Sequence, residues 1–407
     1  AKESTGYVYS YDMLGEGART QADADRYYQS YESAIHVIGK AANGKGPVKS
    51  PGISVKLSAI HPRYEFTHSE RVLQEIPPRL KALCLLAKQY DIGLTVDAEE
   101  SERLDISLDI IEAVFSDPDL GDWQGFGIAV QAYQKRAIHV IEWVRVLTQS
   151  VGRKMMLRLV KGAYWDSEIK HTQQMGLDEF PVFTRKSSTD VSYHACANKL
   201  LDYRDTIYPQ FATHNAYTAS VIIELAGGEQ TSSEAAGFEF QCLHGMGDSL
   251  YDQVVSEVGS QCRVYAPVGE HEDLLAYLVR RLLENGANSS FVNAIVNPDL
   301  PVESLLSDPV ERTQRLAQKA NPHIVRAQAI FGAERDNSKG LDINDPQALI
   351  QLQLDMNRWV DEHVPVMGAT SNITPVLNPA DLSQTVGQLQ YDDAAAMLTK
   401  LDTVDAA

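Results

Sequence analysis

The sequence predicts an α/β fold in which eight parallel strands and their helices close into a barrel of the TIM type. Eight short runs rich in β-forming residues recur between Tyr7 and Val268, and stretches with helical periodicity separate them. Nearly every run ends in polar or charged side chains. A chain of 407 residues also has room for a barrel of about 250 residues and an appendage.

The strand candidates are short runs that are almost continuously apolar. They are Tyr7–Leu14, Gly52–Ile60, Gly93–Ala98, Gly127–Tyr133, Met155–Tyr164, Gln210–Asn215, Phe238–His244 and Arg263–Val268. Among the stretches between them, Ser69–Tyr90 has apolar residues at spacings of three and four, which predicts a helix. This alternation indicates a parallel sheet covered on both faces. Eight repeats favour a closed barrel, and a doubly wound open sheet stays the alternative.

Polar side chains at the strand ends favour the barrel, because barrel enzymes keep their chemistry at the C-terminal rim. They are Glu16, Lys56, Asp97, Gln131, Arg158 with Lys161, His214 with Asn215, Gln241 with His244, and Tyr265. Solvent exposure explains any single residue of this series about as well. It explains eight in succession poorly.

The composition narrows the class of partner and the compartment. The net charge is −19, with 36 basic against 55 acidic residues, which disfavours nucleic acid as the main partner. Four widely spaced cysteines suit buried thiols in a reducing compartment better than disulfides or a zinc site. No apolar stretch approaches the roughly 18 residues of a membrane span, and no export signal is visible. We therefore expect a cytoplasmic protein.

The pattern of alternation ends near residue 296, so we expect a barrel domain over residues 1–296 and a C-terminal appendage over 297–407. Residues 297–330 have a polar, helical pattern. Residues 334–407 are acidic, with 12 Asp and Glu against four Lys and Arg. Frequent Pro, Asn, Asp and Gly residues predict short elements there without an obvious core.

The run Arg158–Trp165 (RLVKGAYW) places two cations, a glycine and two aromatic residues together. In a strand, Arg158 and Lys161 point to opposite sides, so both enter one site only if the strand end bends. Gly162 permits such a bend and lets a ligand approach the backbone. Cations beside aromatic rings suit a flat, electron-accepting ring with a phosphate tail. A basic strand end with core aromatics is the alternative.

Two further strand ends carry hydrogen-bonding groups. Thr213, His214 and Asn215 follow one another, although a strand-end histidine is more often structural. The segment Gln241–Gly247 (QCLHGMG) is similar and richer in glycine. Cys242 has no neighbour in the sequence that would stabilise a thiolate, so we interpret it as a small hydrophobic residue.

The predicted helix His271–Asn285 (HEDLLAYLVRRLLEN) is the most specific feature. Its leucines form an apolar stripe, yet Arg280 and Arg281 lie together in the middle, and Glu284 lies one turn away from both. Paired guanidinium groups suggest bidentate capture of a carboxylate or phosphate, against a solvated helix face as the alternative. Glu16 could pair with one of these arginines across the barrel mouth.

A metal site and a dinucleotide fold are both disfavoured. Asp97-Ala98-Glu99-Glu100 looks like a carboxylate cluster, but most strand ends carry Gln, Lys or Arg, which are poor metal ligands. Neither a GxGxxG motif after a strand nor a Walker loop occurs. A cofactor with a flat ring and a phosphate tail would therefore not be held by a dinucleotide fold.

Several of these motifs occur together in a known family. SVKLSAIHPRY, TVDAEE, AVQAYQKRA, RLVKGAYWD, FATHNA, EFQCLHGMG, VYAPVG and YLVRRLLENGANSSFVN closely resemble the proline dehydrogenase domain of the bifunctional proline utilization A flavoenzymes. The resemblance runs in order from about Tyr7 to Asn293. It implies noncovalent FAD at the C-terminal rim of a distorted β/α barrel whose last helix lies over the mouth.

The resemblance also implies roles for individual residues. The implied flavin contacts are Gln131, Arg158, Val160, Lys161, Gly162, Ala163, Trp165, Thr184, Lys186, Thr213, His214, Asn215, Gln241, Cys242, Glu284 and Phe291. The implied walls of the proline pocket are Lys56, Asp97, Tyr164, Leu243, Tyr265, Arg280 and Arg281. Lys56, Arg280 and Arg281 would pair with the substrate carboxylate, and Glu16 would latch Arg280.

The implied reaction is oxidation of L-proline to Δ1-pyrroline-5-carboxylate, with hydride transfer from Cδ to flavin N5. Arg158 is expected to stabilise the negative charge of the reduced ring. Tyr265 against the substrate ring predicts a preference for proline over 4-hydroxyproline. The resemblance further implies a quinone as electron acceptor at a membrane. Peripheral association with the inner membrane and formation of a homo-oligomer stay open.

The full bifunctional enzyme is longer than this chain. It has an N-terminal arm and a downstream aldehyde dehydrogenase domain, whose opening resembles Asn378–Gly387 (NPADLSQTVG). We therefore expect a truncated chain that performs only the first reaction. The alternatives are another flavin barrel, acting on folate or another cyclic amino acid, and a barrel that binds a carboxylate without turnover.

Overall fold

The structure is a computed structural model that describes residues 6–228, 237–270, 273–286, 306–363 and 373–404. Within these ranges, eight strands close into a barrel in sequence order, and every neighbouring pair is parallel. β1 pairs with β8 along its whole length, from Tyr7 opposite Cys262 to Met13 opposite Val268. This pairing confirms the barrel and excludes the open doubly wound sheet.

All the predicted strands are present, although several end earlier than expected. They are β1 (Tyr7–Met13), β2 (Gly52–Val55), β3 (Leu94–Val96), β4 (Phe126–Gln131), β5 (Met155–Val160), β6 (Ile207–Ala212), β7 (Glu239–Leu243) and β8 (Cys262–Val268). The largest difference follows β2, where Leu57–Ala59 forms a turn of 3-10 helix. Functional side chains after β2 therefore lie on a turn at the rim.

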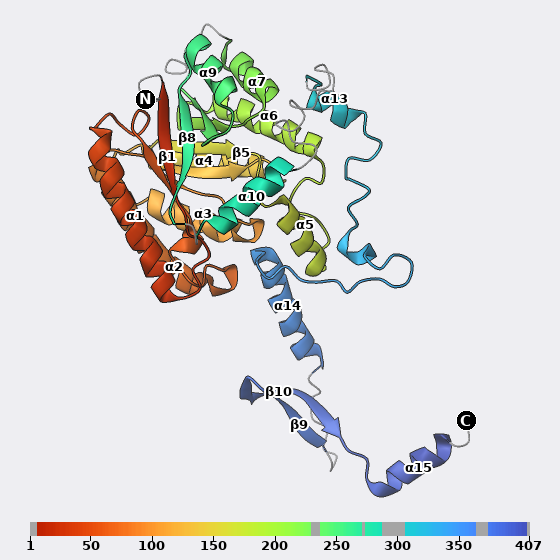
Figure 1. Cartoon of the computed structure of the whole chain (residues 1–407). Coiled ribbons are helices and arrows are strands. Elements are labelled where there is room, and N and C mark those ends of the chain that lie inside the picture. The colour runs from red at the N-terminus through yellow and green to blue at the C-terminus, as the bar shows by residue number, and fades with distance from the viewer. Residues whose placement is uncertain (1–5, 229–236, 271–272, 287–305, 364–372, 405–407) are drawn as a thin grey trace. The chain divides into compact units, whose positions relative to one another are not determined.

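Helices surround the barrel (Figure 1). They are α1 (Gln21–Ala42), α2 (Ser69–Gln89), α3 (Leu104–Phe115), α4 (Ala137–Val151), α5 (Trp165–Gln174), α6 (Lys186–Asp202), α7 (Ala216–Ala226) and α9 (Asp248–Glu257). Their inward stripes supply the core: in α2, Val72, Ile76 and Leu80 are completely buried. Thr20 begins α1 with a capping box, in which its side chain and that of Asp23 each accept from the other's backbone N–H.

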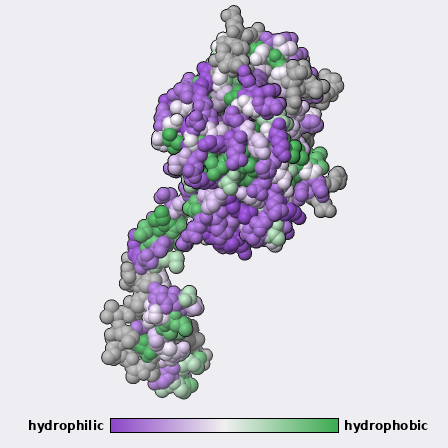
Figure 2. Space-filling model, turned by 90° about the vertical axis from the view of Figure 1, so that its left-hand side faces the viewer, coloured by the Kyte–Doolittle hydropathy of each residue, from purple (hydrophilic) through white to green (hydrophobic). Residues whose placement is uncertain are grey.

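α10 (Leu274–Gly286) departs from this ring. Its Arg280 pairs with Glu16, just after β1, and lies 5.3 Å from the ring centroid of Tyr164, just after β5. β1 and β5 are on opposite sides of an eight-stranded barrel, so α10 lies across the mouth, as predicted. The outer faces of β1 and α1 meanwhile line a groove of about 760 Å³. Figure 2 views the molecule from the side on which α1 lies in Figure 1, and shows a hydrophobic area within a mainly hydrophilic surface.

A buried ion pair closes the N-terminal end of the barrel. Arg263 of β8 is 3% exposed and Glu239 of β7 is 0% exposed, and Arg263 Nε lies 2.6 Å from Glu239 Oε1. The guanidinium also donates to the carbonyl oxygens of Ser50 at 2.8 Å and Val48 at 2.7 Å. Gln210 donates to the same carboxylate at 2.8 Å. These contacts tie β6, β7, β8 and the segment before β2 together.

The chain divides into two compact units, residues 1–344 and 345–407. In the first, α13 (Pro309–Gln314) and a 3-10 turn (Ala327–Ala329) are the helical parts of the described segment after the barrel. Over the described residues 306–330, the helical expectation is therefore wrong outside these two elements. The backbone there is held by tertiary hydrogen bonds instead, such as Asn321 N to Thr184 Oγ1 and Gln173 Nε2 to Val325 O.

The second unit is small. It comprises α14 (Pro346–His363), an antiparallel pair of β9 (Ile373–Asn378) and β10 (Asp381–Gln390), and α15 (Ala394–Val404). The boundary predicted after residue 296 lies outside the described residues and stays a prediction. Among the helices that the structure describes, we find none with the length and apolar character of a membrane span.

Candidate active site

The two cationic side chains at the end of β5 point in different directions. Arg158 points into the barrel, with NH1 2.7 Å from Asp97 Oδ1. Lys161 reaches α6 instead, with Nζ 2.5 Å from Asp190 Oδ1. Between them, Gly162 has φ +133°, and a Cβ atom there would lie 2.4 Å from an aromatic ring. The strand end therefore needs glycine, and it presents one cation on each side.

A buried group of charges lies at the mouth. Lys56 Nζ is 2.5 Å from Asp12 Oδ1 and 3.3 Å from Asp97 Oδ2. The Tyr265 hydroxyl donates to Asp97 Oδ2 at 2.7 Å, and the Arg158 guanidinium carbon lies 4.9 Å from the Tyr265 ring centroid. Two carboxylates thus balance two cations. We call Asp12, Lys56, Asp97 and Arg158 the mouth quartet.

Burial and charge act in opposite directions on the ionisation of these groups. Burial raises the pKa of Asp97, but Lys56 and Arg158 outweigh it, so that the pKa is lowered overall. Burial lowers the pKa of Lys56, but Tyr265, Asp12 and Asp97 together raise it well above its ordinary value. Burial also raises the pKa of Tyr265 well above its ordinary value. At neutral pH, Asp97 is therefore an anion, Lys56 a cation and Tyr265 neutral.

α10 brings its arginines to the same mouth. Arg280 donates to both carboxylate oxygens of Glu16, and the NH2–Oε2 distance is 2.7 Å. This is the pairing that the sequence suggested. Arg281 lies one residue on, with its guanidinium carbon 5.4 Å from the Tyr277 ring centroid. On the same helix Leu275 and Leu282 are each 69% exposed, so the predicted apolar stripe is not buried within the described chain.

A second cationic cluster lies between the end of β5 and α6. Lys186, the first residue of α6, has its Nζ 2.9 Å from Asp190 Oδ2, while Lys161 binds the other oxygen. Burial raises the pKa of Asp190, but the two lysines outweigh it and lower the pKa. One carboxylate therefore orders two lysines at the same place, and two ammonium groups side by side suit an anionic group such as a phosphate.

His214 joins two of the predicted site segments. Its Nε2 accepts a hydrogen bond from the Leu243 backbone N–H at 3.0 Å. Burial, reinforced by Arg281 and Lys161, lowers the pKa of His214 to about 4. The ring is therefore neutral at physiological pH, and because Nε2 accepts, its hydrogen is on Nδ1. His214 is thus a donor at one nitrogen and a support for Leu243 at the other.

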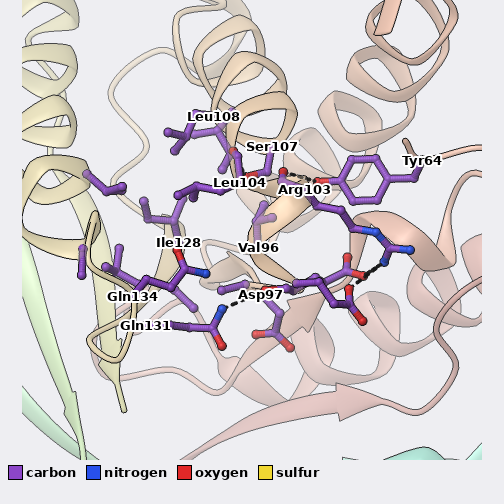
Figure 3. Close-up of a pocket in the computed structure, with 18 residues that line it drawn as sticks. Tyr64, Val96, Asp97, Arg103, Leu104, Ser107, Leu108, Ile128, Gln131 and Gln134 are labelled. Atoms are coloured by element: carbon purple, nitrogen blue, oxygen red, sulfur yellow. Dashed lines mark hydrogen bonds and ion pairs between the residues drawn. The ribbon is translucent and has the colours of Figure 1, made fainter. Parts of the chain in front are cut away.

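Gln131 and Asp97 lie at the ends of the adjacent strands β4 and β3. Figure 3 shows their side chains pointing the same way, beside a small cavity of about 30 Å³. Gln131 Nε2 donates to Glu99 O at 2.8 Å, and its Oε1 accepts from Ala163 N at 3.4 Å. The Glu99 carboxylate turns away to Ser58 N at 3.0 Å. Glu99 and Glu100 meet at Arg103, with carboxylate oxygens 2.7 and 3.1 Å from its NH1. Asp97 pairs instead with Arg158 and Lys56, so the carboxylates of this segment do not all converge.

The other predicted contacts are divided between roles in the fold and places at the rim. Val160 ends β5 and Ala163 follows it. Trp165 Nε1 donates to Phe183 O at 2.8 Å, Thr184 Oγ1 accepts from Asn321 N at 2.9 Å, and Thr213 Oγ1 accepts from Asn215 N at 3.1 Å. Asn215 caps α7 through Thr218 N. Gln241 and Cys242 are buried in β7, with the Cys242 sulfur 3.6 Å from that of Cys262.

Two predicted contacts lie outside what the structure describes: Phe291 as a whole, and the side chain of Glu284. The sequence reasoning also missed two residues, Asp12 and Asp190. Asp12 alternates with Ser10 on the inward face of β1, and this polar pattern near a strand end was a usable signal. Asp190 lies four residues after Lys186 on one helix, a spacing typical of ion pairs.

The family model described as proline dehydrogenase matches residues 1–294, which is well over half of the chain. The chain belongs to the proline dehydrogenase family. This membership confirms the resemblance that the strand-end motifs suggested.

The chain is similar to relatives of the family that are longer than the part it matches. The chain is 52% identical over 404 residues to the bifunctional protein PutA of Salmonella typhimurium, covering 95% of this chain and 30% of that protein. It is 28% identical over 289 residues to proline dehydrogenase 1 of Bacillus subtilis, covering 71% of this chain and 82% of that protein. The chain thus spans about a third of the length of the PutA relative and most of the length of the Bacillus enzyme.

A solved structure supports the same fold. The crystal structure of a mutant of Bradyrhizobium japonicum proline utilization A (PutA) superposes with a TM-score of 0.82 at 53% identity. The match covers 89% of this chain and 36% of that one. The chain therefore shares the fold of that protein over most of its own length.

Proposed function

We propose that the chain binds FAD and oxidises L-proline to Δ1-pyrroline-5-carboxylate. The observation that carries the proposal is the barrel mouth itself, where Arg280 of α10 pairs with Glu16 near Asp12 of the mouth quartet, and Arg281 lies close enough to His214 to lower its pKa. The relatives' names, proline dehydrogenase and PutA, point to proline as the substrate. We take 1–296 as the catalytic domain.

The substrate carboxylate would bind the arginines of α10. A guanidinium binds a carboxylate through two parallel hydrogen bonds, and the Arg280–Glu16 pair already shows this geometry. Lys56 supplies a further cation, and Tyr164, Leu243 and Tyr265 supply walls. Because α10 lies over the mouth, binding there also shields the reacting carbon from water.

The residues at the strand ends suit a flavin. The buried Arg158 Nε and Gln241 Oε1 have no hydrogen-bond partner among the described residues, so each can serve a polar ring. The cluster of Lys161 and Lys186 suits a pyrophosphate. The proposed contacts are Gln131, Arg158, Val160, Lys161, Gly162, Ala163, Trp165, Thr184, Lys186, Thr213, His214, Asn215, Gln241, Cys242, Glu284 and Phe291.

When bound, FAD would accept a hydride from the proline Cδ at its N5. The chain's own groups orient the substrate and set the electrostatics. Arg158 and the Nδ1–H of His214 provide positive charge and a donor where negative charge develops. Lys56 and Tyr265 keep their protons at neutral pH, so neither accepts the proton that the substrate amine must lose. Asp97, with its lowered pKa, is a weak base as well.

The absorption spectrum of the purified protein tests this function. We expect flavin bands, and loss of the band at about 450 nm when proline is added without an electron acceptor. Bleaching by a folate or by another cyclic amino acid, but not by proline, would identify a different flavin barrel. Tight binding of a carboxylate with no bleaching would indicate a non-catalytic module, and a colourless protein with no flavin in its extract would refute the cofactor.

We also propose a quinone as the electron acceptor, following the family resemblance. Reoxidation of the proline-reduced protein by a short-chain quinone, at a rate that saturates with quinone concentration, would support this assignment. Reoxidation by oxygen alone would contradict it. Liposome flotation of the reduced protein would test whether it associates peripherally with a membrane, and light scattering whether it forms a homo-oligomer.

A further inference from the structure

Asp12 is a buried carboxylate on β1 that neither the motifs nor the proposed reaction uses. It is 1% exposed and lies on the inward face of the strand, opposite Ser54 of β2 and Pro267 of β8. An isolated buried carboxylate is costly, so its position needs a compensating charge. The Lys56 ammonium, 2.5 Å from Oδ1, is that charge.

We propose that Asp12 is a positioning residue: it holds Lys56 at the barrel mouth and keeps it protonated for the substrate carboxylate. This inference rests on the proposed function, because it assigns Lys56 to substrate binding. It concerns the contacts of Lys56 within the chain and not its contact with proline.

Asp97 cannot replace Asp12 in this role. Its Oδ1 accepts from Arg158 at 2.7 Å and its Oδ2 from Tyr265 at 2.7 Å, so each oxygen already has a closer donor than Lys56, which lies 3.3 Å from Oδ2. Asp12 binds Lys56 at the shorter distance of 2.5 Å. Without Asp12, the remaining carboxylate would be shared by two buried cations. The lysine is the one that can respond by losing its proton, since arginine does not deprotonate.

Among the described groups around Lys56, we expect only the lysine itself to titrate between pH 7 and 9 in such a variant. Burial raises the pKa of Tyr265, which faces the ammonium from β8, and that of Tyr31, whose hydroxyl accepts from the Lys56 backbone N–H. Both tyrosines stay neutral in this range. The pKa of Asp97 is lowered, and Arg158 is a permanent cation. A new pH dependence at the mouth would therefore report on Lys56.

Binding of cyclopentanecarboxylate to the flavin-loaded protein tests this coupling. The probe has the ring and the carboxylate of proline but no amine, so it remains a monoanion above pH 7 and cannot be oxidised. For the natural sequence we expect a dissociation constant that changes by less than about twofold from pH 7 to 9. For Asp12→Asn we expect it to rise by roughly fivefold or more over that range, as Lys56 loses its charge.

The double variant Asp12→Asn with Lys56→Met isolates the pair. It should bind weakly at every pH and show no more pH dependence than Lys56→Met alone. Glu239→Gln is the matched control, because it also turns a buried carboxylate beside a cation into an amide, but at the other end of the barrel. It should leave the pH dependence of binding unchanged.

Thermal unfolding of the same proteins between pH 7 and 9.5 provides a readout that needs no ligand. A buried lysine whose pKa falls below the unfolded value of about 10.4 binds fewer protons in the folded than in the unfolded state. Stability of Asp12→Asn should therefore rise with pH relative to the natural sequence, and Lys56→Met should abolish this difference. If Asp12→Asn does not fold alone, recovery of folding in the double variant supports the pair.

Three results would overturn the inference. They are a pH dependence of binding in Asp12→Asn no steeper than that of the natural sequence, a pH dependence in Glu239→Gln as steep as that of Asp12→Asn, and persistence of the steep dependence in the double variant. Failure of the proposed function looks different, since the flavin of the natural sequence would then not be reduced by proline. If the probe does not bind to the natural sequence, the thermal unfolding measurements still test whether Asp12 keeps Lys56 protonated.

Discussion

The two ends of the barrel each contain an arginine paired with a buried carboxylate, but they use the pair differently. At the N-terminal end, Arg263 donates to Glu239 and to backbone carbonyls of the segment before β2. At the mouth, Arg158 donates to Asp97 and to Ser54 Oγ, while its Nε has no partner within the described part of the chain. One arginine is saturated by the fold, and the other keeps a donor for a ligand.

The surroundings of the pairs follow the same difference. The hydrogen-bond partners of the N-terminal pair are main-chain carbonyls and the amides of three glutamines, Gln210, Gln241 and Gln261, and these groups do not titrate. The mouth pair contacts Lys56, Asp12 and Tyr265, which are ionisable. The contrast indicates that burial of an ion pair does not by itself mark a functional site. A buried pair with an unused donor and titratable neighbours does.

The largest expected effect is a loss of stability at the N-terminal end of the barrel. Arg263→Met leaves Glu239 as a buried carboxylate without its cation, and breaking such a pair costs about 3–5 kcal/mol. Urea unfolding should show this loss of stability, whereas the flavin spectrum and the KM for proline should remain unchanged in the protein that is still folded. A raised KM with normal stability would place Arg263 in the site and remove the contrast.

The next largest effect is at the mouth, where we expect KM to change and stability to stay the same. Arg281→Met should raise the KM for proline by roughly 10- to 100-fold, because a charge-assisted hydrogen bond to the carboxylate is worth about 1.5–3 kcal/mol. The flavin spectrum and the unfolding midpoint should stay the same. Arg315→Met is the control, since that side chain is 80% exposed and pairs with Glu311. Loss of flavin in Arg281→Met would mean that its role is misassigned.

The sequence predicted the barrel well because the strand runs are apolar on both faces and are separated by helical periodicity. It predicted strand ends less well. SVKLSAI looks like one strand, yet pairing with β3 ends at Val55 opposite Val96, and the chain then turns. The β-propensity of a segment does not tell how long the neighbouring strand is, so it does not predict where pairing with that strand ends. The helical expectation for 297–330 was wrong over most of the described residues 306–330 for a related reason, since tertiary hydrogen bonds of that backbone decide its course.

The site was predicted in part. Polar strand ends and the arginines of α10 were visible in the sequence, and the Glu16–Arg280 pair could be proposed because both follow elements that meet at the mouth. Asp12 was not identified, because a single aspartate inside an aromatic strand looks like an interruption until its partner, 44 residues away, is known. Assignment of flavin and proline came from motif resemblance, because charge and periodicity alone specify only an anion site.

A smaller effect should appear in the pH dependence of stability at the mouth. The pKa of His214 is lowered to about 4 in the folded protein. The folded state therefore binds this proton only at a lower pH than the unfolded state, in which the pKa of a histidine is about 6.5. Stability should fall as the pH drops, by about 1 kcal/mol between pH 6.5 and 5.5 from this residue. His214→Gln should remove that part of the slope. Urea midpoints across the range measure it, and an unchanged slope would show that His214 is charged in the folded protein.

The smallest expected effect is on the dissociation rate of a ligand, as distinct from its association rate. Glu16 and Arg280 join the end of β1 to α10 across the mouth, and both are partly exposed, so the pair is worth less than about 1 kcal/mol. Glu16→Gln should therefore raise the dissociation rate of cyclopentanecarboxylate by roughly threefold, with little change in the association rate. Stopped-flow measurement of the flavin spectrum would resolve the two rates. A lower dissociation rate would mean that Glu16 competes with the ligand for Arg280, so that the pair resists binding instead of closing the helix over it.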